Sequence, residues 1–336
     1  CAIKKGESVL IIANPETSAI AQDLYTASLD AGASPSLMFQ PKKSSLDMAE
    51  KAVIGAIKSE PDVIFSISAN KLGKDEEALA NPYTDAAGQK YSNIFDYLLS
   101  GKKSVRAVWT PGLTQDMYER TVNIDYRLLS ERCKKICSLF ENAKSVKVTS
   151  PAGTDFTVCV EGRKALVDDG DFTKPGTGGN VPSGEVFISP VVGKSSGVIV
   201  FDGSMTFSDG DAMLETPIRA TVKDGFVTDI QGDKEAKRLL KDITAAEKQS
   251  ATDEYRRNAR NIGELGIGLN PAANITGNML EDEKAFRTCH FAIGENYDGD
   301  APALIHFDGI VCSPTIEIEY PDGTSFVLLE KGDLKI

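Results

Sequence analysis

The segment VKVTSPAGTDFTVCV at residues 146–160 divides this chain into two kinds of sequence pattern. Apolar and polar residues alternate on both sides of Pro151-Ala-Gly, which is typical of two antiparallel strands joined by a tight turn. The same pattern continues in SGVIVFDG, ATVKDGFVTDI and IEIEYPDGTSFVLL. One helical stretch interrupts it, from Lys234 to about Gln249. We therefore expect residues 143–336 to form a β-rich domain.

Before this segment, buried-strand runs alternate with stretches of helical periodicity. The strand-like runs are ESVLIIANP, PSLMF, PDVIFSIS and SVRAVW, and the helical stretches include MAEKAVIGAIKS and YSNIFDYLLS. Thr17 is a plausible N-cap for a helix that ends at Asp30. This order predicts an α/β domain with a mostly parallel sheet over residues 1–142, ending in a long bridging helix from about Thr114 to Asn142. The expected fold class is α/β plus α+β.

Composition excludes several classes of function. The chain has 336 residues and a formal net charge of -12, with no basic patch that could follow a phosphate backbone, so we expect no nucleic-acid partner. Its longest apolar runs are far shorter than the ~18 residues that cross a bilayer, so we expect no membrane association. The six cysteines lack the density of a disulfide framework, which favours a cytoplasmic location. Asn14-Pro15-Glu16 follows the first strand where a dinucleotide site would need a glycine-rich loop.

The two histidines of the chain, His290 and His306, both lie near the C-terminus. His306 belongs to IHFD, and in an extended segment it would project to the same face as Asp308, about 6.5 to 7 Å along the strand. That spacing suits one metal ion or two adjacent ones, although H-x-D alone is common by chance. Cys312 lies an even number of residues after His306 and Asp308, so in the same strand its side chain would project to the same face. A buried cysteine that takes no part in a site is, however, the commoner case.

Two glutamates stand in unusual surroundings. Glu185 opens the apolar run EVFI, which fits either a solvent-exposed strand end or a ligand directed into a cleft. Glu264 lies in NIGELGIGLNP, where small and apolar neighbours allow close packing and leave the carboxylate in need of a partner.

Taken in order, these segments resemble a known family. GTDFTVCVEGR, NVPSGEVFISP, NIGELGIGLNP, CHFAIGENY and IHFD are similar to signature segments of the aminopeptidase T and aminopeptidase S family of dinuclear metallopeptidases, over roughly residues 144–327. The resemblance implies a set of metal-site residues in this chain: Glu185, Glu264, His290, Tyr297, His306 and Asp308.

The function implied by this resemblance is a metal-dependent aminopeptidase acting on peptides. Two divalent ions, zinc, cobalt or manganese, would hold a hydroxide that attacks the scissile carbonyl. Glu264 or Glu185 would transfer the proton, and Tyr297 would ligate weakly or stabilise the oxyanion. We also expect a homodimer. The loop DGDAPALI, between Tyr297 and His306, is shorter than in that family and would border the substrate cleft.

Two alternatives stay open. The chain resembles, more distantly, the 2,5-dihydroxypyridine dioxygenases, which look to hold one iron with two histidines and an aspartate. In those enzymes a histidine stands at the position of Glu264 and no carboxylate at that of Glu185. A ferrous site prefers two histidines and one carboxylate, so these glutamates favour the hydrolase. The other alternative, a non-enzymatic metal-binding relative, is weakened by the complete set of six residues.

Overall fold

The computed structural model describes residues 1–44 and 47–336, which form two compact units. The first unit contains Cys1–Tyr126 and Gly170–Ser183, and the second contains Arg127–Asp169 and Gly184–Ile336. The chain therefore leaves the first unit, returns to it once, and ends in the second. The sequence predicts a single boundary, after residue 142. In the structure the chain first crosses between the units at residue 126, and residues 170–183 belong again to the first unit.

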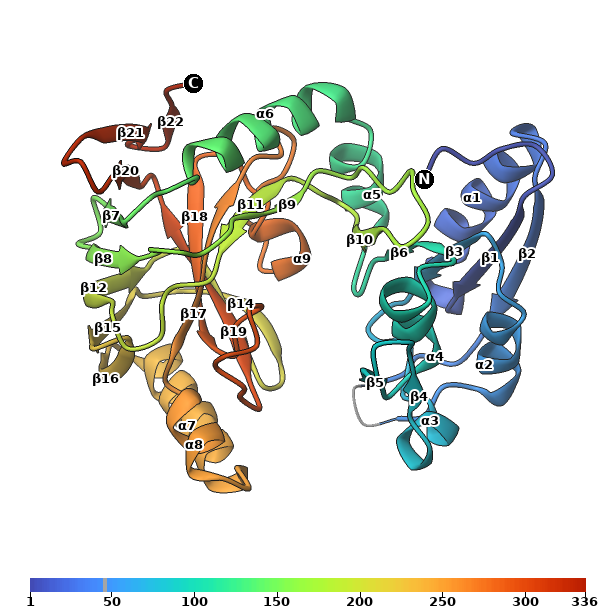
Figure 1. Cartoon of the computed structure of the whole chain (residues 1–336), viewed down its shortest axis with the longest axis horizontal. Helices are drawn as coiled ribbons and strands as arrows, with labels where there is room; N and C mark the ends of the chain where they lie inside the picture. The colour runs from blue at the N-terminus through green and yellow to red at the C-terminus, as the bar shows by residue number, and fades with distance from the viewer. Residues whose placement is uncertain (45–46) are drawn as a thin grey trace. The chain divides into compact units, whose positions relative to one another are not determined.

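The first unit is built on a parallel sheet in the order β10-β6-β3-β1-β2. The predicted parallel sheet is confirmed (Figure 1). Its strands are β1 (Ser8–Ala13), β2 (Ser34–Phe39), β3 (Val63–Ile67), β6 (Arg106–Trp109) and β10 (Gly178–Asn180). A small hairpin of β4 (Tyr83–Thr84) and β5 (Lys90–Tyr91) lies outside the sheet.

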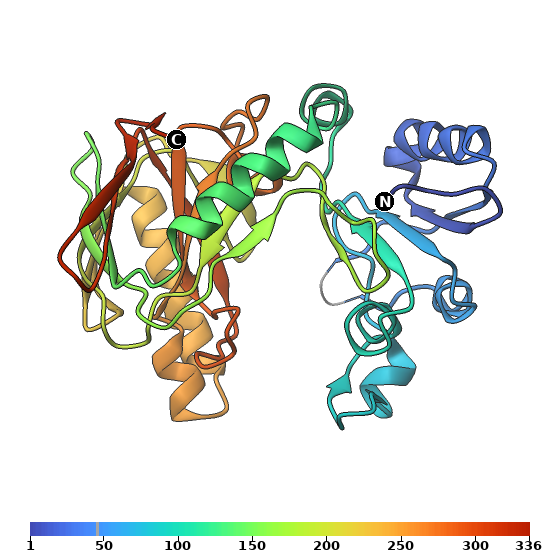
Figure 2. The ribbon, with the colours of Figure 1, turned by 45° about the horizontal axis from the view of Figure 1, so that its top comes forward.

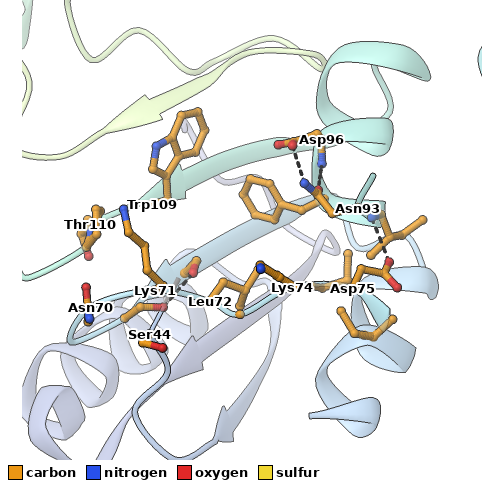
Figure 3. A pocket seen from close by; sticks show the side chains of 18 residues that line it. Ser44, Asn70, Lys71, Leu72, Lys74, Asp75, Asn93, Asp96, Trp109 and Thr110 are labelled. Atoms are coloured by element: carbon orange, nitrogen blue, oxygen red, sulfur yellow. Dashed lines mark hydrogen bonds between the residues drawn. The ribbon is translucent and has the colours of Figure 1, made fainter. Parts of the chain in front are cut away.

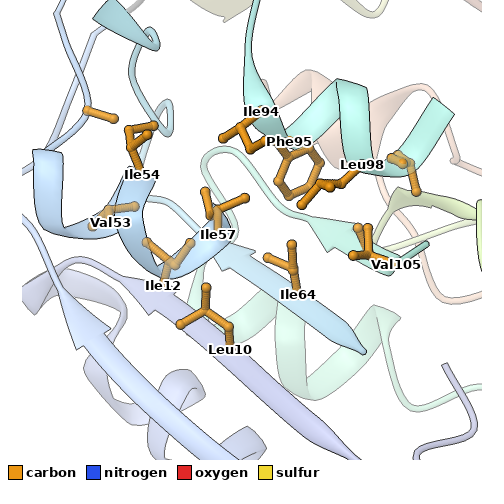
Figure 4. Packing of buried hydrophobic residues seen from close by; sticks show 13 residues of the cluster. Leu10, Ile12, Val53, Ile54, Ile57, Ile64, Ile94, Phe95, Leu98 and Val105 are labelled. Atoms are coloured by element: carbon orange, nitrogen blue, oxygen red, sulfur yellow. The ribbon is translucent and has the colours of Figure 1, made fainter. Parts of the chain in front are cut away.

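Short helices pack on this sheet. They are η1 (Pro15–Thr17), α1 (Ser18–Asp30), α2 (Lys51–Lys58), α3 (Glu76–Ala80), α4 (Ile94–Asp96) and the π-helical turn η2 (Tyr97–Gly101). Ile54 and Ile57 of α2 and Phe95 of α4 bury their side chains with Ile12 and Ile64 of the strands (Figure 4). This apolar contact, rather than the intrinsic stability of such short helices, holds them in place.

The predicted long helix from Thr114 to Asn142 is wrong, because the structure has two helices there. They are α5 (Gln115–Thr121) and α6 (Tyr126–Leu139). The break coincides with the run TVNID at 121–125, in which β-branched residues, Asn and Asp all have low helix propensity. The apolar spacing continues across the break, so periodicity alone could not reveal it.

The second unit contains two antiparallel sheets (Figure 2). One has the order β14-β13-β19-β18-β17-β11-β9 and the other the order β16-β15-β12-β8-β7-β20-β21-β22. The rings of Phe156 (β8) and Phe291 (β18) meet edge to face, 5.3 Å apart, and so join the sheets. The strands of the first sheet are β9 (Leu166–Asp168), β11 (Glu185–Ile188), β13 (Ser204–Phe207), β14 (Gly210–Met213), β17 (Ile262–Gly268), β18 (Thr288–Gly294) and β19 (His306–Cys312).

The second sheet and three further helices complete this unit, to which α6 also belongs. The strands are β7 (Ser145–Thr149), β8 (Asp155–Cys159), β12 (Ser196–Phe201), β15 (Ile218–Lys223), β16 (Phe226–Gln231), β20 (Thr315–Glu319), β21 (Ser325–Glu330) and β22 (Asp333–Leu334). The helices are α7 (Lys234–Gln249), α8 (Asp253–Asn258) and α9 (Met279–Asp282). The predicted hairpin at Pro151 and the predicted helix at Lys234 are both confirmed. Within residues 1–44 and 47–336, none of the helices has the length and hydropathy needed to span a membrane.

Candidate metal centre

Four neighbouring strands of the second unit place acidic and imidazole side chains on one face of a sheet. The strands lie in the order β19-β18-β17-β11. Glu264 on β17 is opposite Ala292 on β18, which in turn is opposite Asp308 on β19. Because side chains alternate between faces, His306, two residues before Asp308, and His290, two residues before Ala292, lie on this same face. Glu185 joins them from β11, where it is paired with Gly268.

Gly266 makes room for one of the two imidazoles. It is opposite His290 in the strand register, and a Cβ atom built on it would lie 2.0 Å from His290 Nε2. Any side chain at this position would therefore displace the ring. The glycine in GELGIG thus explains how a fully buried histidine can extend across β17 toward carboxylates on neighbouring strands.

His290 forms the first cluster with two glutamates. Its Nε2 atom lies 3.1 Å from Glu264 Oε1 and 3.5 Å from Glu185 Oε2. All three residues are buried, with exposures of 7% or less. One nitrogen and two oxygens therefore converge on a small, water-poor space.

His306 forms the second cluster, and Glu264 belongs to it as well. His306 Nε2 lies 3.5 Å from Glu264 Oε2 and 3.4 Å from Asp308 Oδ1. On the other side of the ring, Nδ1 lies 2.9 Å from the carbonyl oxygen of Glu295. A carbonyl only accepts, so Nδ1 donates and Nε2 is the nitrogen presented to the carboxylates.

The donor atoms fit divalent metal ions. Glu185 Oε2, Glu264 Oε2 and Asp308 Oδ1 are buried and have no hydrogen-bond partner in the part of the chain that the structure describes. Buried carboxylate oxygens of this kind are stable only with a compensating charge or ligand. Ligand atoms within 4.8 Å of one another occur in Glu185, Glu264 and His290, in Glu264, His306 and Asp308, and in Glu283, His290 and Asp308. Nitrogen and oxygen donors suit zinc, cobalt or manganese.

The electrostatics of the cluster attract positive charge. Burial alone would lower the pKa of His290, but its hydrogen bond to Glu264 and the charge of Glu185 raise it to about 9. The pKa of His306 is likewise raised to about 10, against burial, by Asp308 and then Glu264. Burial opposes ionisation of Asp308, but the charge of His306 lowers the pKa of this carboxyl below its usual range. Protons on the imidazoles thus balance the carboxylates, and a bound divalent ion would displace them.

Sequence reasoning missed a buried lysine beside the centre. Lys284 is 2% exposed, and its Nζ atom lies 2.5 Å from Glu185 Oε1, 2.6 Å from Glu283 Oε1 and 3.5 Å from Asp168 Oδ2. Its ammonium group therefore binds the Glu185 oxygen that does not face His290. In the sequence, EDEKAF has the composition of a solvated surface, and nothing in it indicates burial.

Tyr297 and Cys312 stand apart from these clusters. The Tyr297 side chain is 61% exposed, and its ring packs 5.4 Å from the His306 ring and 5.1 Å from the Phe187 ring. It thus borders the centre on the side of His306. Cys312 belongs to none of the ligand groups found among the described residues, and its backbone N–H donates to Asp202.

Comparison with known proteins agrees with this architecture. The family model "NicX: 2,5-dihydroxypyridine 5,6-dioxygenase" matches residues 115–318. The 2,5-dihydroxypyridine dioxygenase from Pseudomonas putida KT2440 is 18% identical, with a TM-score of 0.69 over 98% of this chain and 92% of its own. Wild-type AmpT (aminopeptidase T) from Thermus thermophilus is 17% identical, with a TM-score of 0.70 over 99% of this chain and 95% of its own. At these identities the structural likeness establishes the fold. No curated protein sequence matches the chain.

Proposed function

We propose that this chain, which belongs to the family of the 2,5-dihydroxypyridine 5,6-dioxygenase model, is a metal-dependent aminopeptidase with two divalent ions. Family membership and both structural likenesses support a metalloenzyme. The choice of a hydrolase rests on the ligands of the centre.

The observation that carries the proposal is the distribution of the two histidines. Among the described residues, none of the ligand groups contains both His290 and His306. Each imidazole is grouped with carboxylates only, and Glu264 occurs in a group with each histidine. A single ferrous ion in an oxygenase prefers two histidines and one carboxylate around one point. Carboxylate-rich groups around each of the two histidines, with Glu264 common to both sides, instead fit two ions placed side by side, as in dinuclear hydrolases.

Divalent ions held by these residues would supply Lewis acidity and lower the pKa of a water molecule. In the proposed reaction, Glu264 or Glu185 would accept a proton from a water molecule as its oxygen adds to the scissile carbonyl carbon, and would return that proton to the amine nitrogen as the C–N bond breaks. The exposed Tyr297 donates a hydrogen bond to the oxygen of the tetrahedral intermediate. His306 keeps its orientation through the hydrogen bond from Nδ1 to Glu295.

The activity test uses two substrates and two atmospheres. Supplied with cobalt, zinc or manganese, the protein should release N-terminal residues from short peptides in the absence of oxygen. Supplied with ferrous iron and oxygen, it should not open the ring of 2,5-dihydroxypyridine. Oxygen uptake with the pyridine, together with no amino acid released from a broad panel of peptides, would reject the hydrolase.

Metal content gives a second, independent prediction. Protein purified without chelator should carry up to two divalent ions per chain, and Asp308→Asn should carry fewer, because it loses a charged oxygen of the second cluster. Inductively coupled plasma mass spectrometry measures the stoichiometry. Asp242→Asn is a matched control, since Asp242 is also buried but accepts a hydrogen bond from the Ser208 backbone, outside the centre. Equal metal content in both variants would contradict the assigned site.

A second candidate function is oxidative ring cleavage. It is favoured by the description of the family model, whose match spans the strands of the candidate centre, β11 and β17 to β19. The same pair of assays decides between the two reactions, because only the dioxygenase consumes oxygen.

A further inference from the structure

The first unit contains a cavity that the proposed reaction does not use. It has a volume of about 380 Å³ and lies at the carboxyl ends of β3 and β6 (Figure 3). Ile54 and Ile57 of α2, Phe95 of α4 and Trp109 of β6 form its apolar lining. The Phe95 and Trp109 rings meet edge to face, 5.8 Å apart. This volume lies within the ~300 to 1,000 Å³ typical of small-molecule sites.

Its place in the sheet is one where parallel sheets bind ligands. From β1 the chain first adds β2 on one side and then crosses to add β3 and β6 on the other. The crevice outside the carboxyl ends of the strands at such a reversal is the usual ligand site of open α/β sheets, and this cavity lies at the same edge, over the neighbouring strands β3 and β6. Ser66 and Ser68 at the end of β3, and Thr110 after β6, line the cavity at this edge.

Polar groups gather at the same edge. The hydroxyls of Ser66 and Ser68 are buried and 3.1 Å apart. Thr110 is 1% exposed, and its Oγ1 has no hydrogen-bond partner within residues 1–44 and 47–336. Lys71 and Lys74 also line the cavity, and neither forms an ion pair with any described residue. The two carboxylates of the lining are already hydrogen-bonded, Asp75 to the Ile94 backbone N–H and Asp96 to the Asn93 side chain. Figure 3 shows the Lys71 side chain extended toward Trp109.

Buried amides hold the loop that carries these lysines. The Asn14 side chain accepts a hydrogen bond from the Ala69 backbone N–H at 2.7 Å, and the Gln40 side chain donates to the Leu72 carbonyl at 2.8 Å. Both amide residues are 2% exposed or less. The loop is therefore fixed before any ligand arrives, which lowers the entropy cost of binding.

We propose that this cavity binds a small organic anion with an apolar body. The apolar wall contacts the body, while Lys71, Lys74 and the Thr110 hydroxyl contact the anionic group. The absence of a glycine-rich loop after β1 argues against a dinucleotide. The site does not depend on the proposed metal centre, since its residues belong to the first unit.

Trp109 is the one tryptophan of the chain and reports directly on the cavity. We expect phenylacetate and phenyl phosphate to change its fluorescence in a saturable way and to raise the melting temperature. A preference between these two probes tells a carboxylate ligand from a phosphate ligand. Benzyl alcohol lacks the anionic group, and inorganic phosphate lacks the apolar body. Each should bind at least ~10-fold more weakly than the two probes. An equal response to benzyl alcohol, or no response to either anion in fluorescence and calorimetry, would overturn the proposal.

Variants test the contacts. The double variant Lys71→Met/Lys74→Met should bind the better anion roughly 10-fold more weakly, and Thr110→Val should also weaken it. Lys51→Met is the matched control, because Lys51 is 89% exposed on α2 and does not line the cavity. Asp308→Asn, which damages the metal centre, should bind the anion like the unaltered protein. Unchanged affinity in the double variant would contradict the assigned contacts.

Discussion

Glu264→Gln should lower peptide turnover by at least ~100-fold and reduce the number of bound metal ions. Glu264 is the residue that both clusters share, with Oε1 3.1 Å from His290 Nε2 and Oε2 3.5 Å from His306 Nε2. Glutamine has nearly the same size but no charge, and its amide nitrogen cannot ligate a cation. The substitution therefore weakens both ligand groups at once without leaving a cavity.

Measuring metal content and turnover together separates the two roles of this glutamate. Loss of both identifies Glu264 as a ligand, while retained metal with lost turnover identifies it as the proton carrier. Glu235→Gln is the control, since Glu235 is a buried glutamate of α7 in the same unit, beside Lys234. Full metal content and full turnover in Glu264→Gln would remove Glu264 from the centre.

Lys284→Met should destabilise the metal-free protein by roughly 3 to 5 kcal/mol, the usual effect of removing one partner from a buried ion cluster. The ammonium group lies 2.5 Å from Glu185 and 2.6 Å from Glu283, so its loss leaves the buried carboxylate of Glu185 and the partly buried carboxylate of Glu283 without compensation. Divalent ions should restore part of the stability, because they bring positive charge to the same acidic region. Urea unfolding with chelator, and with manganese, measures both effects.

Lys234→Met is the comparison for this variant. Lys234 pairs with Glu215 at 2.5 Å, but both side chains are well exposed, so its removal should change stability by no more than about 1 kcal/mol. If Lys284→Met were as stable as Lys234→Met in chelator, Lys284 would not be the group that balances the acidic cluster.

The centre could be predicted from sequence to the extent that it lies on regular strands. Once β17, β18 and β19 are neighbours, alternation along each strand is enough to bring Glu264, His290, His306 and Asp308 to one face. The chemical signal was that His306, one of two histidines in the chain, stands two residues before an aspartate, and the full set of residues came from the family resemblance. The ligand roles of these residues stay predictions until metal binding is measured.

Other features had no local signal. Lys284 is buried because Glu185 and Asp168, about a hundred residues away in sequence, lie beside it. The charged residues next to Lys284 in the sequence give no indication of such distant partners. The return of residues 170–183 to the first unit was missed because β10, with the sequence GGN, lacks the β-branched and aromatic residues that mark strands. The break before α6 was missed because apolar periodicity continued through it.

The pairing of β10 with β6 has a consequence for biosynthesis. A ribosome releases β6 at residues 106–109, but β10, at residues 178–180, follows only after α6 and β7 to β9 of the second unit have been made. Until then the β6 edge has unpaired backbone N–H and C=O groups and can pair with another nascent chain. A truncated chain that stops at Tyr126 would keep that edge open permanently, so shortened forms of this protein should aggregate where the full chain does not.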